Sequence, residues 1–150
     1  MDIFDALLES HELQRAICRR LLAQVGDAKA RTRTFDELKA ELAAHETAEE
    51  RTFYVPLIEH DETVEAARHG IAEHHEMDEM VEQLDKLDQG SAEWLELIGK
   101  LVHQIEHHLK EEEEKFFPQA REVLSRHQQK GLGEPYREEH DRLRAKEDAP

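Results

Sequence analysis

The sequence has a single cysteine, few aromatic residues and a large deficit of positive charge. Because Cys18 stands alone, an intramolecular disulfide is excluded, as is a zinc or iron–sulfur site built from several thiolates of one chain. The formal net charge of -16 argues against general binding to nucleic acid or to an anionic membrane, since both attract basic surfaces. The expected partners are therefore small molecules or other proteins, and the oligomeric state stays open.

Long apolar runs are missing as well. No segment approaches the roughly 20 apolar residues that a membrane-spanning helix needs. Residues 1–5, MDIFD, lack the basic start and apolar run of an export signal. We therefore expect a cytoplasmic protein with no membrane association, a compartment that also suits an unpaired cysteine.

Helix-forming residues dominate the composition. Charged residues make up 37% and hydrophobic residues 38% of the chain, and long stretches are rich in Ala, Glu, Leu, Lys and Arg, which favour helices. Four amphipathic segments lie between glycine and proline breakers, at about 2–24, 34–56, 61–87 and 91–116. Thr34 with Glu37 has the pattern of a capping box that begins the second segment. The sequence predicts an all-α, antiparallel up-down-up-down four-helix bundle with a short C-terminal helical extension.

The chain changes character after Pro118. A short helix is expected over residues 119–127, and Gly131, Gly133 and Pro135 indicate a loop. The stretch 136–150 is polar enough to be either partly disordered or a loosely docked helix. We therefore divide the chain into a metal-binding domain at 1–127 and a polar tail at 128–150.

The spacing of the histidines is unusual. The chain has 11 of them, and His11 precedes His45 by the same 34 residues that separate His74 from His108. An offset of 63 residues relates the two histidine pairs and also relates Glu49 to Glu112. Residues 34 apart in a helical hairpin return to similar heights, because half of the chain climbs and half descends. The repeat predicts two related hairpins that place four histidines and two glutamates in one layer.

Helical faces separate inward from outward histidines, since an inward residue continues the apolar stripe at steps of three and four. Two segments do so with a histidine and a glutamate: Leu38-Leu42-His45-Glu49-Phe53 and Leu101-Ile105-His108-Glu112-Phe116. His11 and His74 lie on or near the stripes of the other two segments. The remaining histidines are expected at the surface, namely His60, His69, His75, His103, His107, His127 and His140.

Some choices at the third segment stay open. His74 is preferred to its neighbour His75 because it continues the stripe of Ile71 and Met77. Asp78 is a borderline candidate ligand, about 40° around the helix from His74.

In the second segment, Tyr54 is a candidate for contact with the site, although ordinary packing or a surface place fits its position equally well.

Buried carboxylates require compensation. A lone inward histidine is usually a core residue with a satisfied hydrogen bond, but two uncompensated carboxylates in an apolar layer would cost several kcal/mol each. Four imidazoles and two carboxylates without a thiolate suit iron, manganese or zinc rather than copper(I) or calcium. The ferritin-like di-iron pattern is disfavoured because Glu-x-x-His does not occur in the chain. A structural bundle with adventitious zinc or no metal stays the alternative.

The sequence resembles the hemerythrin-like, or HHE cation-binding, family over about residues 3–118. The resemblance rests on four segments: Leu7-Leu8 before His11, His45-x-x-x-Glu49 ending in Phe53-Tyr54, Glu73-His74, and His108-x-x-x-Glu112 ending in Phe116-Phe117-Pro118. It implies two iron ions in an oxo- or hydroxo- and carboxylate-bridged centre. The implied ligands are His11, His45, Glu49, His74, His108 and Glu112.

One departure from the oxygen-carrying members bears on function. Those proteins have a further histidine four residues after the third-segment ligand, where this chain has Asp78. The resemblance then implies more open coordination, which favours reaction with hydrogen peroxide, dioxygen or nitric oxide in oxidative or nitrosative stress defence. The alternative is a protein that binds, senses or stores oxygen or iron without turnover.

Overall fold

Helices make up the regular structure of the protein, and the computed structural model describes residues 1–147, in which no strand occurs. The predicted all-α class is confirmed. Residues 148–150 of the predicted tail lie outside the described range. The elements in chain order are α1 (Ile3–Ala23), α2 (Ala28–Glu49), η1 (Glu50–Tyr54), α3 (Val55–Ile58), α4 (Val64–Lys86), α5 (Ala92–Glu111), η2 (Glu112–Phe116), α6 (Phe117–Val123), α7 (Arg126–Gly131) and α8 (Gly133–Glu147).

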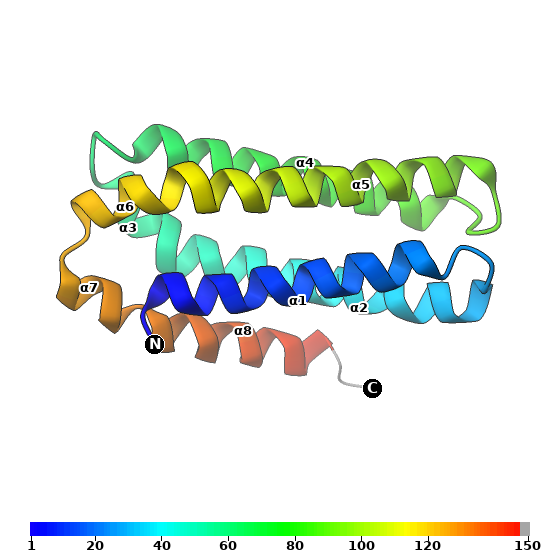
Figure 1. The fold of residues 1–150 in the computed structure, drawn as a ribbon, viewed down its shortest axis with the longest axis horizontal. Coiled ribbons are helices and arrows are strands. Elements are labelled where there is room, and N and C mark those ends of the chain that lie inside the picture. The colour runs from blue at the N-terminus through cyan, green and yellow to red at the C-terminus, as the bar shows by residue number, and fades with distance from the viewer. Residues whose placement is uncertain (148–150) are drawn as a thin grey trace.

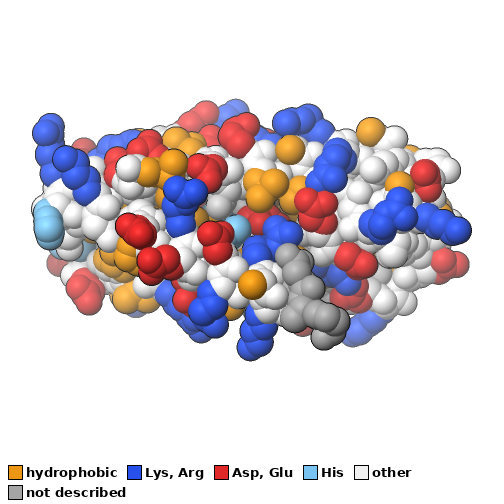
Figure 2. Space-filling view, turned by 90° about the horizontal axis from the view of Figure 1, so that it is seen from below, with side chains coloured by type: hydrophobic (Ala, Val, Ile, Leu, Met, Phe, Trp, Pro, Cys, Tyr) orange, Lys and Arg blue, Asp and Glu red, His pale blue; other side chains and the backbone are white. Residues whose placement is uncertain are grey.

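The long helices form two antiparallel hairpins, α1 with α2 and α4 with α5, which lie one above the other in Figure 1. A further helix of 15 residues, α8, runs below α1 and α2, so the protein has one long helix more than a plain four-helix bundle. No helix of residues 1–147 is long and apolar enough to span a bilayer. On the α8 side, acidic and basic side chains are interspersed (Figure 2).

Side-chain caps fix where the hairpins begin. Asp2 and Asp5 form a capping box at the start of α1, and the Asp27 side chain accepts a hydrogen bond from the backbone N–H of Ala30 at the start of α2. The predicted start of the second helix at Thr34 is therefore wrong by about two turns. The Thr34 hydroxyl is buried within α2 and instead donates to Gln24 Oε1 over 2.6 Å.

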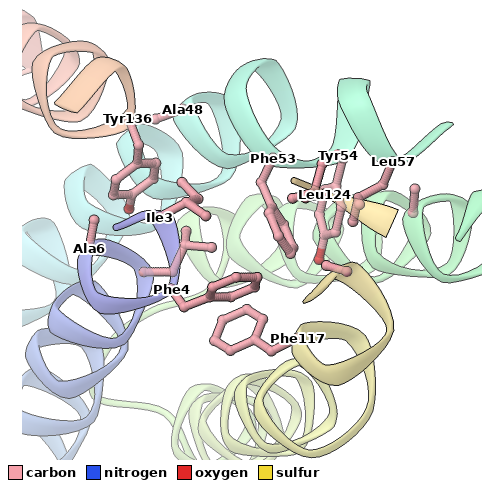
Figure 3. Packing of buried hydrophobic residues seen from close by; sticks show 13 residues of the cluster. Ile3, Phe4, Ala6, Ala48, Phe53, Tyr54, Leu57, Phe117, Leu124 and Tyr136 are labelled. Carbon is pink, nitrogen blue, oxygen red and sulfur yellow. The ribbon is translucent and has the colours of Figure 1, made fainter. Parts of the chain in front are cut away.

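Two apolar clusters fill the bundle interior, one on each side of the histidine layer. On α1, His11 lies between Leu7 of the first cluster and Ile17 of the second. On α4, His74 likewise lies between Ala67 of the first cluster and Met77 of the second. Three phenylalanines turn toward one another in the first cluster, with ring centroids 5.2–6.0 Å apart: Phe4, Phe53 and Phe117 (Figure 3). The histidine layer is thus closed by apolar side chains from both ends.

Two π-helical turns begin at the inward glutamates, η1 directly after Glu49 and η2 at Glu112 itself. The backbone N–H of Val55 donates to the carbonyl of Glu50, and that of Phe117 donates to the carbonyl of Glu112, both five residues back. Each π turn adds one residue to the helical path and rotates the residues beyond it. Consecutive aromatic residues are therefore both buried, Phe53 with Tyr54 and Phe116 with Phe117.

The prolines after the π turns do not end the helical path. Pro56 lies in the first turn of α3, and Pro118 lies in the first turn of α6. Proline is tolerated there because the first turn needs no backbone N–H from it. The break predicted at Pro56 is therefore displaced to Glu59. The short helix expected over 119–127 is divided instead, because Ser125 caps the start of α7.

The polar stretch after Gly131 forms α8, which docks through one buried carboxylate. Glu41 of α2 is fully buried and accepts hydrogen bonds from His140 Nε2 over 2.8 Å and from Arg144 over 2.6 Å. The expectation of a surface position for His140 is wrong, since its side chain is only 13% exposed. These charged hydrogen bonds to Glu41 explain how so polar a helix is held against α2.

The contribution of His140 to stability is expected to fall as pH rises. Burial lowers the pKa of His140, but the hydrogen bond and charge of Glu41, with Asp141, outweigh it and leave the pKa raised. The stabilisation is complete below the unfolded pKa of about 6.5 and is lost as pH passes the raised folded pKa. Arg144 shares the Glu41 carboxylate with His140, and the Tyr136 ring lies against the His140 ring with centroids 5.9 Å apart.

We expect the difference in free energy of unfolding between the native chain and His140→Gln to be largest near pH 6 and to shrink toward about pH 9. Urea titrations at both pH values measure it. His75→Gln is the control, because His75 is 74% exposed. A difference that grows with pH would contradict the assignment.

Candidate metal centre

The structure brings all six predicted site residues together in one buried layer. His11, His45, His74 and His108 are each at most 2% exposed, and Glu49 and Glu112 are fully buried. Successive ring centroids lie 5.4, 6.5 and 4.8 Å apart in that order. The donor atoms form two groups that share a carboxylate: His11, His45, Glu49 and Glu112 in the first, and Glu49, His74 and His108 in the second.

Each carboxylate lies between two histidines of different helices. Glu49 Oε1 is 3.1 Å from His74 Nε2 and 3.5 Å from His45 Nε2. Glu112 Oε1 is 3.1 Å from His11 Nε2 and 3.5 Å from His108 Nε2. Every one of the four longest helices therefore contributes to the layer, so the site exists only in the folded bundle.

The unpaired atoms of this layer fit metal ions. All four Nε2 atoms, both oxygens of Glu49 and Oε1 of Glu112 are buried and have no hydrogen-bond partner, since their approaches are at ion-pair distance without hydrogen-bond geometry. Buried polar atoms left unpaired cost free energy and are rare in native proteins. Imidazole nitrogens and carboxylate oxygens aimed at a common volume are the donors that first-row transition ions take.

The outer nitrogen of each histidine is held by a separate partner. Nδ1 donates to Glu113 from His11 over 2.7 Å, to Glu50 from His74 over 2.8 Å and to Glu73 from His108 over 2.7 Å. With Nδ1 donating, Nε2 is the nitrogen that can offer its lone pair to a metal ion. These contacts also fix the ring planes, so the Nε2 atoms stay directed inward.

The fourth histidine is held from α8. His45 Nδ1 and the Tyr136 hydroxyl are 2.6 Å apart, and the same hydroxyl is 2.7 Å from Ser10 Oγ. Tyr136 is 1% exposed. The C-terminal helix thereby extends into the support of the candidate site.

The charges of the layer depend on one another. Burial lowers the pKa of His11, but the close approach of Glu112 and the hydrogen bond with Glu113 outweigh it and raise the pKa to about 9. Burial raises the pKa of Glu49, but the charge of His45 and the close approaches of His45 and His74 leave it well below its ordinary value. The Glu49 carboxylate is therefore ionised, and a bound cation would take the place of a proton on His11.

Tyr54 lies against the layer rather than at the surface. Its side chain is fully buried, and its hydroxyl donates to Glu112 Oε2. Burial raises the pKa of Tyr54 well above its ordinary value, and the charges of Glu112 and Glu49 raise it further. The phenol thus stays protonated as a donor. A straight helix would turn it away, whereas the π turn of η1 brings it inward.

The structure distinguishes between the candidate ligands on α4, which are His74, His75 and Asp78. His74 belongs to the layer, whereas His75 is 74% exposed and pairs with Glu79 over 3.0 Å. Asp78 is exposed. Burial raises the pKa of Glu46 well above its ordinary value, and the neighbouring Asp78 raises it further. Asp78 therefore belongs to neither donor group of the layer.

Sequence reasoning missed the residues that support the histidines. For two of them a signal existed, because Glu50 and Glu113 each come directly after an inward glutamate and obey the 63-residue offset. Glu73 precedes His74, but nothing in the sequence pairs it with His108. Tyr136 lies outside the repeat, so no spacing pointed to it.

The comparisons agree with this geometry. Residues 2–120 match the family described as the hemerythrin HHE cation binding domain. The chain belongs to this family. The predicted resemblance is thus confirmed, and the matched part of the HHE domain contains all six residues of the layer. No curated protein and no solved structure matches the chain. Because the match ends at residue 120, Tyr136 and α8 lie beyond it.

Replacing Tyr136 by phenylalanine is expected to weaken metal binding by the HHE domain about 10- to 100-fold, the usual effect of removing a hydrogen bond to a metal-binding histidine. The ring would still fill its place, so the bundle should stay folded. Competition with a chromophoric chelator measures the affinity. Glu138→Gln, an exposed change on α8, is the control, and equal affinities of the two variants would refute the role of the hydroxyl.

Proposed function

We propose that this protein holds two iron ions and reacts with a small oxidant, namely hydrogen peroxide, dioxygen or nitric oxide, in cytoplasmic defence against oxidative or nitrosative stress. One observation carries the proposal: four buried Nε2 atoms, both oxygens of Glu49 and Oε1 of Glu112, all unpaired by hydrogen bonds, face one another across four helices. Glu49 belongs to both donor groups, which supports a pair of ions rather than one.

The chain's own residues would bind the ions and control protons around them. Bound iron would supply open coordination positions and a ferrous–ferric couple. Glu50, Glu73, Glu113 and Tyr136 orient the four imidazoles, and Tyr54 holds a proton at its hydroxyl oxygen against Glu112. The Phe117 ring stacks on His11 with centroids 5.7 Å apart, which helps to exclude bulk water from that end.

The proposal extends to the arrangement of the domain. We assign the metal-binding four-helix bundle to α1, α2, α4 and α5, within residues 1–127, and treat the tail from 128 as an accessory segment that docks on it. The contribution of each of the four helices to the histidine layer supports this division. Tyr136 then acts from outside the bundle proper.

The residue at position 78 favours a reaction with the oxidant over reversible carriage of oxygen. The resemblance to oxygen carriers calls for a fifth histidine there, and the aspartate found instead is exposed and belongs to neither donor group. Fewer protein donors leave more positions for an exogenous ligand. The alternative, binding or storage of oxygen or iron without turnover, uses the same six residues and is separated by experiment.

Anaerobic loading with ferrous iron, with separate additions of peroxide, dioxygen and nitric oxide afterwards, tests the function. We expect about two irons per chain, absorption changes upon addition, and catalytic consumption of at least one of the three. Stopped-flow spectra and electrode measurements record both. Fully reversible uptake of oxygen with no turnover of any of the three would favour the alternative. Less than about one iron per chain would refute the metal centre itself.

A further inference from the structure

A second group of histidines and carboxylates lies on the outer side of the α4–α5 hairpin. His69 Nε2 is 2.8 Å from Glu111 Oε1 and 3.5 Å from Glu73 Oε2. His107 Nε2 is 3.3 Å from Glu111 Oε2 and 3.7 Å from Glu73 Oε2. Two imidazoles from two helices thus approach the same two carboxylates. We call these four residues the outer cluster.

We propose that the outer cluster is a second cation site, distinct from the buried layer, which binds a divalent first-row transition ion. Donor atoms of His69, Glu73 and Glu111 lie within 4.8 Å of one another, close enough for one ion to contact all three. Two imidazoles and two carboxylates without thiolate suit Zn²⁺ or Fe²⁺. The side chains of His69 and His107 are 53% and 55% exposed, so an ion reaches them from solvent.

The arrangement differs from an ordinary pair of surface side chains on the same helix. His75 and Glu79 on α4 form such a pair, since both are well exposed. In the outer cluster the carboxylates are instead largely buried, with side-chain exposures of 12% for Glu111 and 6% for Glu73. Carboxylates held in place on two helices lose less conformational entropy when an ion binds.

Glu73 connects the outer cluster with the buried layer. Its Oε1 accepts the hydrogen bond from His108 Nδ1 over 2.7 Å, while its Oε2 faces His69 and His107. An ion on Oε2 would draw electron density from the carboxylate and weaken the hydrogen bond that orients His108. This coupling rests on the proposed function, whereas ion binding at the outer cluster does not.

The neighbouring surface favours cations. A hollow beside His69 is lined by three glutamates and one lysine, together with apolar and neutral side chains. The glutamates are Glu62, Glu65 and Glu111, and the lysine is Lys115. The excess of negative charge raises the local concentration of cations at this face.

Zinc binding to the iron-treated full-length protein tests the proposal. Equilibrium dialysis with metal analysis counts zinc and iron per chain in three proteins: the native chain, His69→Gln/His107→Gln, and the matched control His75→Gln. We expect the native chain and the control to bind one zinc more than the double variant, or to bind it at least about 10-fold more tightly. Iron content should be the same in all three, because neither replaced histidine belongs to the buried layer.

A second variant guards against loss of the fold. Glu111→Gln keeps the shape of the side chain and should lose the same zinc, and thermal unfolding without zinc shows whether each variant is folded. Equal zinc binding by the native chain and the two outer-cluster variants would overturn the proposal. The difference in zinc content between the native chain and the double variant can be measured even if the protein holds no iron. Failure of the buried centre is therefore distinguishable from failure of the outer site.

Discussion

Replacing Glu112 by glutamine is expected to reduce bound iron from about two ions per chain to fewer than one, with affinity lower by at least about 100-fold. Glu112 Oε1 lies between His11 and His108, and its Oε2 accepts from Tyr54. If the amide oxygen keeps the bond with Tyr54, the amide N–H groups face the two Nε2 atoms and occupy their lone pairs. The change therefore removes a negative charge and blocks two neighbouring donors.

Metal analysis after iron loading and gel filtration measures the loss. Glu114→Gln is the matched control, because Glu114 belongs to the same acidic run but is exposed. The control should retain the native iron content and the native gain in melting temperature upon iron loading, since a ligand that binds only the folded state stabilises it. Full iron content in Glu112→Gln would show that this carboxylate is not a ligand.

Replacing Gly70 by alanine is expected to lower the free energy of unfolding by about 1–3 kcal/mol, the usual cost of overfilling a packed interior. A Cβ at Gly70 would overlap the hydroxyl and ring of Tyr54. The ring has no free space, because it is fully buried and its hydroxyl is bonded to Glu112. Relief of the overlap requires α4 and η1 to move apart or Tyr54 to leave Glu112.

Gly99→Ala is the matched control for the glycine on α4. Gly99 lies in the interior of α5, and a Cβ there meets nothing within 4 Å. Alanine should stabilise that helix by up to about 1 kcal/mol, because it restricts the unfolded chain and favours helix. Chemical denaturation of both variants measures the two effects. Stabilisation by Gly70→Ala as well would contradict the close packing of Gly70 on Tyr54.

The apolar stripes predicted the inward histidines correctly because the helices are regular up to the inward glutamates. From His45 to Glu49, and from His108 to Glu112, ordinary α-helical spacing holds. Beyond these positions each chain segment enters a π turn. A face drawn on a straight helix has no place for the residue that a π turn adds. The inward orientation of Tyr54 could therefore not be predicted from the sequence.

The position of the docked tail could not be predicted from the sequence either, but for a different reason. Over residues 133–147, polarity predicts exposure, since charged groups are costly to bury. The structure meets that cost with Glu41, whose buried charge is paired by His140 and Arg144. Such pairing joins residues about 100 positions apart in the chain, and no local pattern encodes it.

The sequence by itself determined the helical class, the family and the six residues that face one another, because helical periodicity and a repeated spacing fix which side chains share a face and a height. Only the tertiary structure decided what surrounds them: the carboxylates on three histidines, Tyr136 on the fourth, Tyr54 on Glu112, and the outer cluster across α4 and α5. These contacts depend on distances between helices, and distances between helices are set by packing rather than by spacing along the chain.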